Sequence, residues 1–194
     1  NQFIIKATHA SSYNLIVRDK EKLNKTKTAK LFKKWLGKSQ YYRTGQEWAY
    51  KDVQPRLIAE KLLKDEGGIS LIDYKFYCFS GEAKFLEVHL DREQNHKRAF
   101  YDFDFKLLPF RYTKPEKTIS SDIEKPSNLE EMIKLSEILS ANFPFVRVDF
   151  YSIEGKAIFG EMTFYPSDGR KDFIPDEYNK IILAHGIIPK GNYL

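Results

Sequence analysis

The segment of residues 145–166, FVRVDFYSIEGKAIFGEMTFYP, constrains the fold more than any other part of the chain. Apolar and polar residues alternate along both of its halves, and the pair Glu154-Gly155 interrupts the alternation between them. A period of two is typical of half-buried strands, and a glycine-containing break between two such runs is typical of a hairpin. The sequence therefore predicts an antiparallel β-hairpin with one apolar face and one charged face.

The length of the turn decides whether the acidic side chains of this hairpin share a face. Because successive side chains of a strand point to opposite faces, a two-residue turn would separate Asp149 and Glu161. A three-residue turn over residues 153–155 is a common hairpin connection and would place both on one face, with Arg147 opposite Glu161. We predict the three-residue turn, since it also gathers the apolar residues on the face that is buried.

Two carboxylates on one face repel each other unless a cation lies between them. One interpretation of this hairpin is an ordinary cross-strand pair between Arg147 and Glu161. The other is a Mg²⁺ site, because this ion takes oxygen ligands from one or two carboxylates and completes its shell with substrate phosphates. Arg147, two residues before Asp149, could then contact a phosphoryl group in transfer. The pattern alone leaves both interpretations open.

The composition bounds the kinds of protein that fit. The chain has 194 residues, 42% of them hydrophobic and 15% aromatic, enough for one globular domain or two small lobes. Its single cysteine, Cys78, lies between aromatic residues, so we expect a buried thiol and neither an intrachain disulfide nor a cysteine-rich zinc site. No apolar run approaches the roughly 18 residues of a membrane span, and no signal peptide is visible, so we expect a cytoplasmic protein. The net charge of +5 suits several kinds of anionic ligand and separates none of them.

A strand that ends in a lysine opens the chain. Residues 2–6 read as a strand ending at Lys6, small and polar residues follow as a loop over 7–14, and residues 15–17 read as a second strand. Such a loop can cover phosphates with backbone amides and hydroxyl groups, while the lysine supplies a point charge. The alternative is an ordinary hairpin loop beside a surface lysine.

The remaining segments predict a mixture of helices and strands, and hence the α+β class. We predict helices over residues 26–36 and 129–142, the second beginning at a capping box over 127–130. The charged segment 91–98 is predicted to be a loop, either solvated or mobile and phosphate-binding. The predicted strands are 56–63, which we expect to be buried, 72–78, 83–90 and 101–110.

Several nucleotide-binding and catalytic motifs are absent from the sequence. It contains no Gly-Lys-Ser/Thr phosphate loop, no Rossmann glycine fingerprint and no His-Glu-x-x-His, His-Arg-Asp or Asp-Phe-Gly motif. The four histidines also lack the spacing of metal ligands. These absences exclude P-loop enzymes, Rossmann dehydrogenases, zinc proteases of this type and protein kinases.

What remains is an ordered set of charged residues on predicted strands: Lys6, Glu60, Arg147, Asp149 and Glu161. This order resembles the ATP-grasp superfamily. The phrases LIAEKLL, DYKFYCFSG, NHKRAFYDFDFKLLPF, FPFVRVDFY and FGEMTFYP are more closely similar to the TupA-like ATP-grasp family of polysaccharide biosynthesis proteins. The resemblance covers nearly the whole chain and is specific in the combination of the phrases. It implies an α+β ATP-grasp fold in which two lobes, residues 1–63 and 64–194, hold ATP between antiparallel sheets.

The resemblance implies that the first lobe binds ATP through both its phosphates and its base. Lys6 would bind the α- and β-phosphates beneath the loop 8–14, whose expected contacts are His9, Ser11 and Ser12. Glu60 would accept a hydrogen bond from the adenine amino group. The remaining hinge contacts would come from the backbone of Lys61, Leu62 and Leu63.

The second lobe, by the same resemblance, holds the metal ion and the reacting groups. Asp149 and Glu161 would bind Mg²⁺, with Thr163 as a third ligand, and Arg147 would contact the transferred phosphoryl group or the acyl phosphate. Further expected contacts with phosphate or substrate are Lys75, Arg92, Lys97 and Arg98.

Three features depart from the family pattern. Ala10 and Ser12 stand where relatives usually carry glycine, and a Cβ there limits how closely the backbone approaches a phosphate. Thr163 stands where many ATP-grasp enzymes have an asparagine ligand. The chain begins almost at Lys6, so we expect the usual N-terminal lobe to be absent from it.

The chemistry implied by the resemblance is carboxylate activation. ATP phosphorylates a carboxylate, and an amine then displaces phosphate from the acyl phosphate to form an amide, a task of positioning and charge stabilisation. We expect an ATP- and Mg²⁺-dependent ligase that joins an amino acid to a surface or capsular polysaccharide or its precursor, with no nucleic acid as a partner. The alternatives are a sugar or polysaccharide kinase of the same fold and a non-catalytic basic module that binds an anionic glycan.

Overall fold

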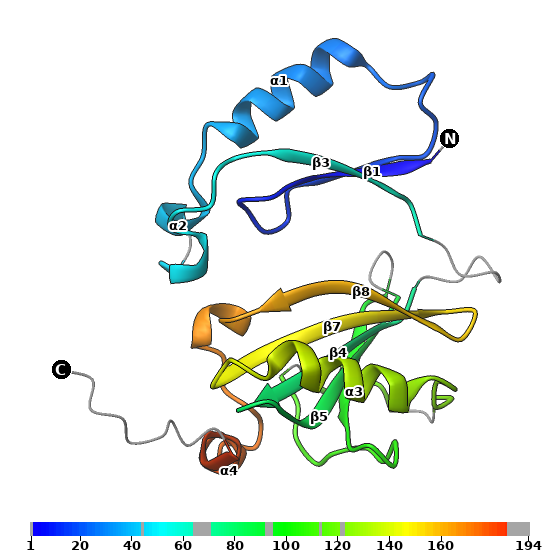
Figure 1. The fold of residues 1–194 in the computed structure, drawn as a ribbon, viewed down its shortest axis with the longest axis vertical. Helices are drawn as coiled ribbons and strands as arrows, with labels where there is room; N and C mark the ends of the chain where they lie inside the picture. Colours follow the sequence, from blue (N-terminus) through cyan, green and yellow to red (C-terminus); the bar gives the residue numbers. More distant parts are fainter. Residues whose placement is uncertain are drawn as a thin grey trace. The chain divides into compact units, whose positions relative to one another are not determined.

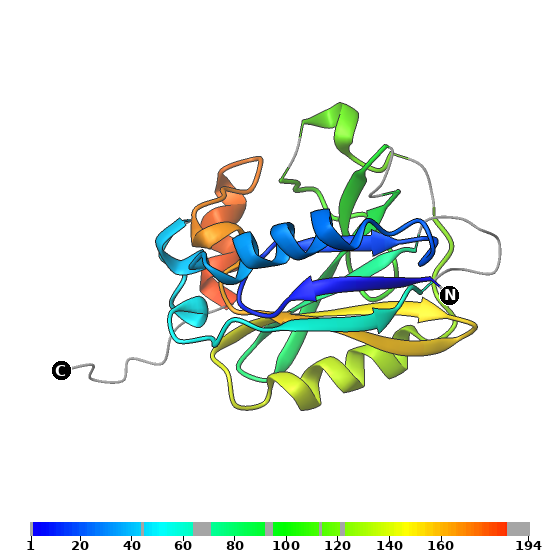
Figure 2. The same ribbon diagram turned by 90° about the horizontal axis from the view of Figure 1, so that it is seen from above.

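Two compact units make up the chain, Asn1–Leu63 and Lys64–Leu194. The computed structural model (Figures 1 and 2) describes residues 2–43, 45–63, 71–91, 95–112, 114–120 and 123–185. Each unit has its own antiparallel sheet and its own helices. The predicted α+β class is therefore confirmed.

The first unit contains a three-stranded sheet in the order β2-β1-β3. β1 (Phe3–Ala7) and β2 (Asn14–Val17) form a hairpin, as the sequence predicts, and β3 (Leu57–Lys61) pairs with the other edge of β1. The prediction that this third strand is buried is wrong, because residues 58–61 are exposed. An edge strand of so small a sheet has too few neighbours to cover it.

One long helix, α1 (Lys25–Leu36), lies over this sheet (Figures 1 and 2) and confirms the predicted helix 26–36. Asn24 caps its first turn, since its side chain accepts a hydrogen bond of 2.9 Å from the backbone N–H of Lys27. Gly37 follows its last residue. The aromatic-rich segment after it forms two short helical turns, α2 (Gln40–Arg43) and η1 (Trp48–Tyr50).

The second unit contains a five-stranded antiparallel sheet in the order β6-β5-β4-β7-β8. Its strands are β4 (Asp73–Phe79), β5 (Glu82–Leu90), β6 (Lys97–Tyr101), β7 (Phe145–Ile153) and β8 (Lys156–Thr163). The predicted hairpin of β7 with β8 is confirmed, and the predicted strands 72–78 and 83–90 form a second hairpin, β4 with β5. Lys97 and Arg98, predicted to lie in a loop, are instead the first residues of β6.

The predicted strand 101–110 is wrong beyond its first residue. Asp102 closes a turn with Lys106, since the backbone N–H of Asp102 donates to the Lys106 carbonyl at 3.0 Å. The Asp102 carboxylate also accepts from the Lys106 N–H at 2.8 Å. Aspartate commonly bonds to its own turn in this way, and the turn overrides the strand preference of the aromatic residues around it.

The helix α3 (Leu129–Ser140) packs against one face of this sheet (Figure 1). The predicted capping box does not form, because the N-cap is Asn128 and not Ser127. The Asn128 side chain caps no helical N–H and instead accepts a hydrogen bond of 2.8 Å from the Ser152 hydroxyl. The core between α3 and the sheet includes Leu129, Met132, Phe76, Leu86 and Val148.

No described helix has the length and apolar character needed to cross a membrane.

Three short helices of this unit lie outside the sheet: η2 (Pro115–Lys117), η3 (Pro166–Gly169) and α4 (Glu177–His185).

The face of the sheet opposite α3 is divided into an aromatic part and a charged part. The aromatic cluster consists of Tyr77, Phe79, Phe85, Phe100, Phe110, Phe173 and Ile182. The buried charged or polar side chains of the same face are Asp73, Lys75, Glu87, His89 and Asp149.

Candidate functional site

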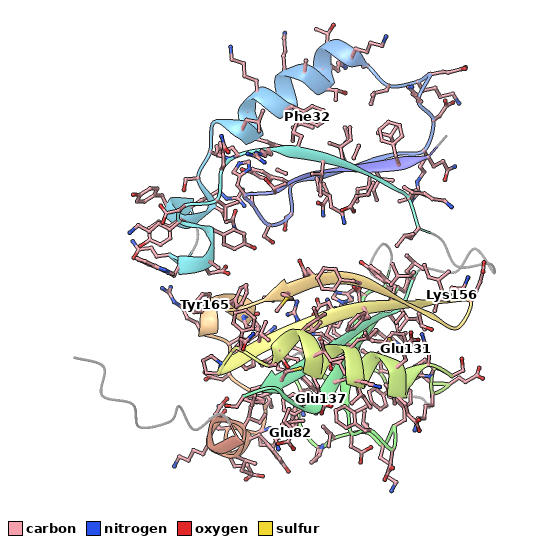
Figure 3. The ribbon with its side chains drawn as sticks, in the orientation of Figure 1. Phe32, Glu82, Glu131, Glu137, Lys156 and Tyr165 are labelled. Carbon is pink, nitrogen blue, oxygen red and sulfur yellow. The ribbon has the colours of Figure 1, made fainter. Side chains whose placement is uncertain are left out.

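The hairpin of β7 and β8 closes with a two-residue turn, so the predicted three-residue turn is wrong. Ile153 pairs with Lys156, which Figure 3 labels at the turn. The residues between them, Glu154 and Gly155, have φ angles of 52° and 70°. Two consecutive positive φ angles are typical of the tight turn that matches the twist of paired strands. Glu154 thus adopts a left-handed conformation, which is uncommon for a residue other than glycine.

A β-bulge at Gly160 restores the alignment that the short turn alone would lose. The cross-strand pairs on either side of it are Phe150 with Phe159, Asp149 with Glu161, and Arg147 with Thr163. Gly160 is left without a partner in the ladder. A Cβ at this position would lie 3.1 Å from the Asp149 carbonyl oxygen, so glycine suits the close approach. Asp149 and Glu161 therefore share a face, although Arg147 lies opposite Thr163 and not, as predicted, opposite Glu161.

Asp149 is the centre of a buried ion-pair network. It is 2% exposed, and its two carboxylate oxygens accept hydrogen bonds of 2.7 Å from Nε and Nη2 of Arg147. Lys75, its partner across β4 and β7, also donates to Oδ2 and lies 3.5 Å from Asp73. Burial acts to raise the pKa of Asp149, but Lys75 and Arg147 bring it below its usual value. Asp149 is therefore held ionised between two cations.

Arg147 connects the three residues predicted to bind metal. Besides Asp149, its Nη2 donates to the Thr163 hydroxyl at 2.9 Å and lies 3.4 Å from the Glu161 carboxylate. The Glu161 side chain is 64% exposed. Partial shielding from water by the neighbouring protein, together with repulsion by Asp149, raises the pKa of Glu161. A cation between the two carboxylates would oppose this effect.

The donor set of this face fits Mg²⁺. Two carboxylates and a hydroxyl, from Asp149, Glu161 and Thr163, are hard oxygen ligands, and Mg²⁺ usually takes its other ligands from water and phosphate. A larger cluster is not formed, since the part of the chain that the structure describes has no group of three or more His, Cys, Asp or Glu side chains that could hold a metal ion.

A second group of buried polar side chains lies beside the first on the same sheet face. Glu87, opposite Lys75, accepts a hydrogen bond of 3.1 Å from the Tyr77 hydroxyl. Its other oxygen lies 3.2 Å from Nε2 of His89 and 3.3 Å from Nη1 of Arg98. Burial acts to raise the pKa of Glu87, but His89 and Arg98 bring it below its usual value. Arg98 was among the predicted contacts, whereas Glu87 and His89 were not. The alternation of polar residues along β5 was the sequence signal that could have identified them.

His89 is held neutral in this second group. Burial lowers its pKa below the ordinary 6.5, against the opposing effect of Glu87. Its Nδ1 lies 3.1 Å from Nε2 of His96. Of the remaining predicted contacts, Lys97 pairs with Leu90 in the sheet, and Arg92 lies outside the described residues.

In the first unit, Lys6 and Glu60 contact each other. Their side chains, 37% and 44% exposed, form an ion pair of 2.5 Å between the neighbouring strands β1 and β3. Of the predicted hinge residues, Lys61 ends β3, and the Leu62 N–H donates to the Gln2 carbonyl at 3.4 Å. The last one, Leu63, directly follows and is half-buried.

The loop between β1 and β2 is anchored to α1 by its aromatic residues. His9 is 2% exposed, and its Nε2 donates to the Trp35 carbonyl at 3.0 Å. Tyr13 stacks on the Trp35 ring at 5.2 Å. Ser11 and Ser12 are exposed, and Ser12 is left-handed with a φ of 65°. The His9 side chain thus has a structural partner, whereas the hydroxyls of the two serines face the surface.

The predicted site residues fall into two groups, one in each unit. Those of the first unit comprise the pair of Lys6 with Glu60, the loop 8–14 and the segment 61–63. Those that the structure brings together in the second unit are Lys75, Arg147, Asp149, Glu161 and Thr163, with Arg98 in the neighbouring group. Figure 3 labels Tyr165 just beyond the end of β8 that carries Thr163.

Solved structures similar to this chain are D-alanine–D-alanine ligases. The ligase from Bacillus anthracis complexed with ATP is 13% identical, with a TM-score of 0.49 over 96% of this chain and 49% of that chain. A second structure of the ligase from Bacillus anthracis is 15% identical, with a TM-score of 0.48 over 96% and 50%. The ligase from Helicobacter pylori is 13% identical, with a TM-score of 0.40 over 87% and 43%. This chain spans about half the length of these ligases.

A search among curated proteins gave no match. A protein-family model described as TupA-like ATPgrasp matches residues 1–186. This match covers all but the last residues of the chain and confirms the resemblance seen in its strand phrases. The chain belongs to the TupA-like ATP-grasp family.

Proposed function

We propose that this chain acts as an ATP- and Mg²⁺-dependent carboxylate–amine ligase that forms its amide through an acyl phosphate. The observation that carries the proposal is the arrangement of Lys75, Arg147, Asp149 and Glu161 on one sheet face in a member of the ATP-grasp family. Transfer of a phosphoryl group needs a metal ion and cations placed around developing negative charge, and little covalent chemistry from the protein. This face supplies side chains of both kinds.

The metal ligands in this proposal are Asp149, Glu161 and Thr163. Bound Mg²⁺ would neutralise charge on the ATP phosphates. Arg147 already contacts all three side chains, and so it would lie beside the transferred group with donors to offer its oxygens. Lys75 would keep Asp149 ionised and oriented, because it binds Oδ2 from the buried side of the network.

The phosphate and base contacts in this proposal come from the first unit. Lys6 would bind phosphates, with the exposed hydroxyls of Ser11 and Ser12 as further donors, and Glu60 with the segment 61–63 would bind adenine. Lys6 and Glu60 neutralise each other in their ion pair. An ion pair this exposed contributes about 1 kcal/mol or less, so ATP could take over both partners at little cost.

The substrates belong to the proposal as well. The family resemblance supports an amino acid as the amine and a carboxylate of a surface polysaccharide or its precursor as the acceptor. A cytoplasmic location would give the enzyme access to ATP.

Calorimetry of ATP binding with and without Mg²⁺ tests the proposal. We expect Mg²⁺-dependent binding that Lys6→Ala and Glu161→Gln each weaken at least tenfold. Lys84→Ala is the matched control, because Lys84 also forms an ion pair of 2.5 Å with a glutamate, Glu82, but lies outside the candidate site. Absence of ATP binding by the folded chain, or equal loss in the control, would contradict the proposal.

Product analysis then separates a ligase from a kinase. A ligase releases free phosphate as an amide forms, whereas a kinase leaves the phosphoryl group on its acceptor. Phosphorylated glycan as the final product would therefore contradict the ligase assignment and keep the ATP site.

A further inference from the structure

Two cations converge on the ring of Tyr112 in the second unit. The guanidinium carbon of Arg98 lies 5.5 Å from the ring centroid, and the ammonium nitrogen of Lys171 lies 5.2 Å from it. Phe173 stacks on the same ring at 4.3 Å, and Phe100 packs edge-on at 5.2 Å. The aromatic contacts thus hold Tyr112 in place, with both positive charges near its ring.

Arg98 is held in place but does not use all of its donors. Its Nη1 lies 3.3 Å from the Glu87 carboxylate, and its side chain is 14% exposed. Its Nε is buried and has no hydrogen-bond partner among the described residues. The Nε side of a guanidinium is one of the edges that bind a carboxylate with two parallel hydrogen bonds. An unpaired buried donor costs free energy that an incoming acceptor would recover.

Lys171 adds a second positive charge that the described residues do not balance. Its side chain is exposed, and its ammonium group forms no ion pair with a carboxylate among the described residues. Burial and the charge of Arg98 lower the pKa of Lys171, against the opposing effect of Glu87. One carboxylate, Glu87, therefore faces two cations, and an anion bound between them would remove their mutual repulsion.

We infer that Arg98 and Lys171 bind a carboxylate over the ring of Tyr112. This inference rests on the proposed function. The bound carboxylate would belong to the amine substrate, an amino acid whose own carboxylate takes no part in forming the amide. Such a group must be held away from the phosphoryl donor, or it would compete with the acceptor carboxylate. The planar edge of Arg98 binds carboxylates and phosphates alike. The choice of a carboxylate therefore rests on the amino acid substrate of the proposed function, and a phosphate titration tests it.

The strand order and register of the sheet place Arg98 at a suitable separation from the face that carries Asp149. Strand β6, which carries Arg98, is three strand spacings from β7, which carries Asp149. Three spacings of about 4.8 Å separate the two strands by about 14 Å. Arg98 also lies two residues along the sheet from the row of Glu87, Lys75 and Asp149, so the backbone positions are about 16 Å apart. Two long side chains shorten the distance that a ligand must span. A small amino acid could thus have its carboxylate at Arg98 while its amine points toward the metal-binding face.

Nuclear magnetic resonance of the arginine Nε–H groups tests the inference on the full chain without ATP. The probe is N-acetylalanine, and its amide, which lacks the charge, is the matched control ligand. We expect the Arg98 signal, assigned by its loss in Arg98→Lys, to shift saturably with the acid and at least fivefold less with the amide. Lys171→Gln should weaken the acid at least threefold, whereas Lys180→Gln, at an exposed position of α4, should not change it.

Three results would overturn the inference: no saturable shift with the acid, an equal shift with the amide, or unchanged affinity in Lys171→Gln. Tighter binding of inorganic phosphate than of the acid would overturn the choice of a carboxylate. The titration is independent of ATP. If the chain binds N-acetylalanine but not ATP, the ligase assignment is wrong and the carboxylate site stands. If the chain binds ATP but not N-acetylalanine, the carboxylate site is wrong and the ligase assignment stands.

Discussion

Lys75 on β4 and Asp149 on β7 lie directly opposite each other in the sheet, and their ion pair is almost completely buried. Two charges removed from water are costly, and the cost is met here because Arg147 also binds the same carboxylate. Removal of one partner of such a group leaves the others charged, buried and unpaired. Both the candidate site and the stability of the second unit therefore depend on the Asp149 side chain.

Asp149→Asn should lower the free energy of unfolding by about 3–5 kcal/mol, the usual cost of breaking a buried ion pair. Glu161→Gln makes the same chemical change at the paired position of β8, where the side chain is 64% exposed, and should cost less than about 1 kcal/mol. Urea denaturation of both variants measures the difference. Equal losses of unfolding free energy in the two variants would contradict a stabilising role of the buried ion pair. Because Glu161→Gln is expected to leave the fold stable, it is the better variant for tests of Mg²⁺ binding.

Cys78 should report the opening of the second unit. It is fully buried on β4, and burial raises the pKa of its thiol, so both access and thiolate formation are suppressed in the folded state. We expect a thiol reagent to modify it only when the unit opens, and at least 100-fold faster in Asp149→Asn, because about 1.4 kcal/mol corresponds to a factor of ten. Fast modification of the native chain, or the same acceleration in Glu161→Gln, would contradict this expectation.

Stability should fall with decreasing pH in two steps. The unfolded chain protonates His89 near the ordinary pKa of 6.5, whereas the folded chain resists protonation, so stability is lost as the pH falls below that value. The lowered pKa of Glu87 stabilises the fold above its usual value of 4.5, and this contribution is lost at lower pH. Urea midpoints measured from pH 7.5 to 3.5 would show both steps. His89→Gln should remove the first step, and parallel curves for variant and parent would refute the assignment.

The loop after β1 should tolerate a β-branched residue at one serine and not at the next. Ser12 has a φ of 65°, where a valine is strained, so Ser12→Val should cost about 1–2 kcal/mol. Ser11→Val, at an exposed neighbour without positive φ, should change stability by about 0.5 kcal/mol or less. Amide hydrogen exchange in β1 and β2 measures both. Equal protection in the two variants would contradict the role assigned to the backbone of Ser12.

Alternation along the strands predicted the hairpins of both units, because it depends only on neighbouring residues in the chain. It did not predict the bulge, although an isolated glycine within a strand, here Gly160, is a known sign of one. Nor did it predict the burial of Glu87 and His89, since their partners come from other strands. The capping box was wrong because the N-cap is Asn128 and not Ser127, and the Asn128 side chain bonds to Ser152, which is distant in sequence.

The aromatic cluster limits how far the chain can be shortened at its C-terminal side. Phe173 and Ile182 belong to this cluster, and Phe173 packs on the rings of Phe100, Phe110 and Tyr112. A chain cut before Phe173 would expose these rings to water as one patch, and a patch of that kind promotes association between molecules. Preparation of a monodisperse sample therefore requires that the chain extend at least to Ile182.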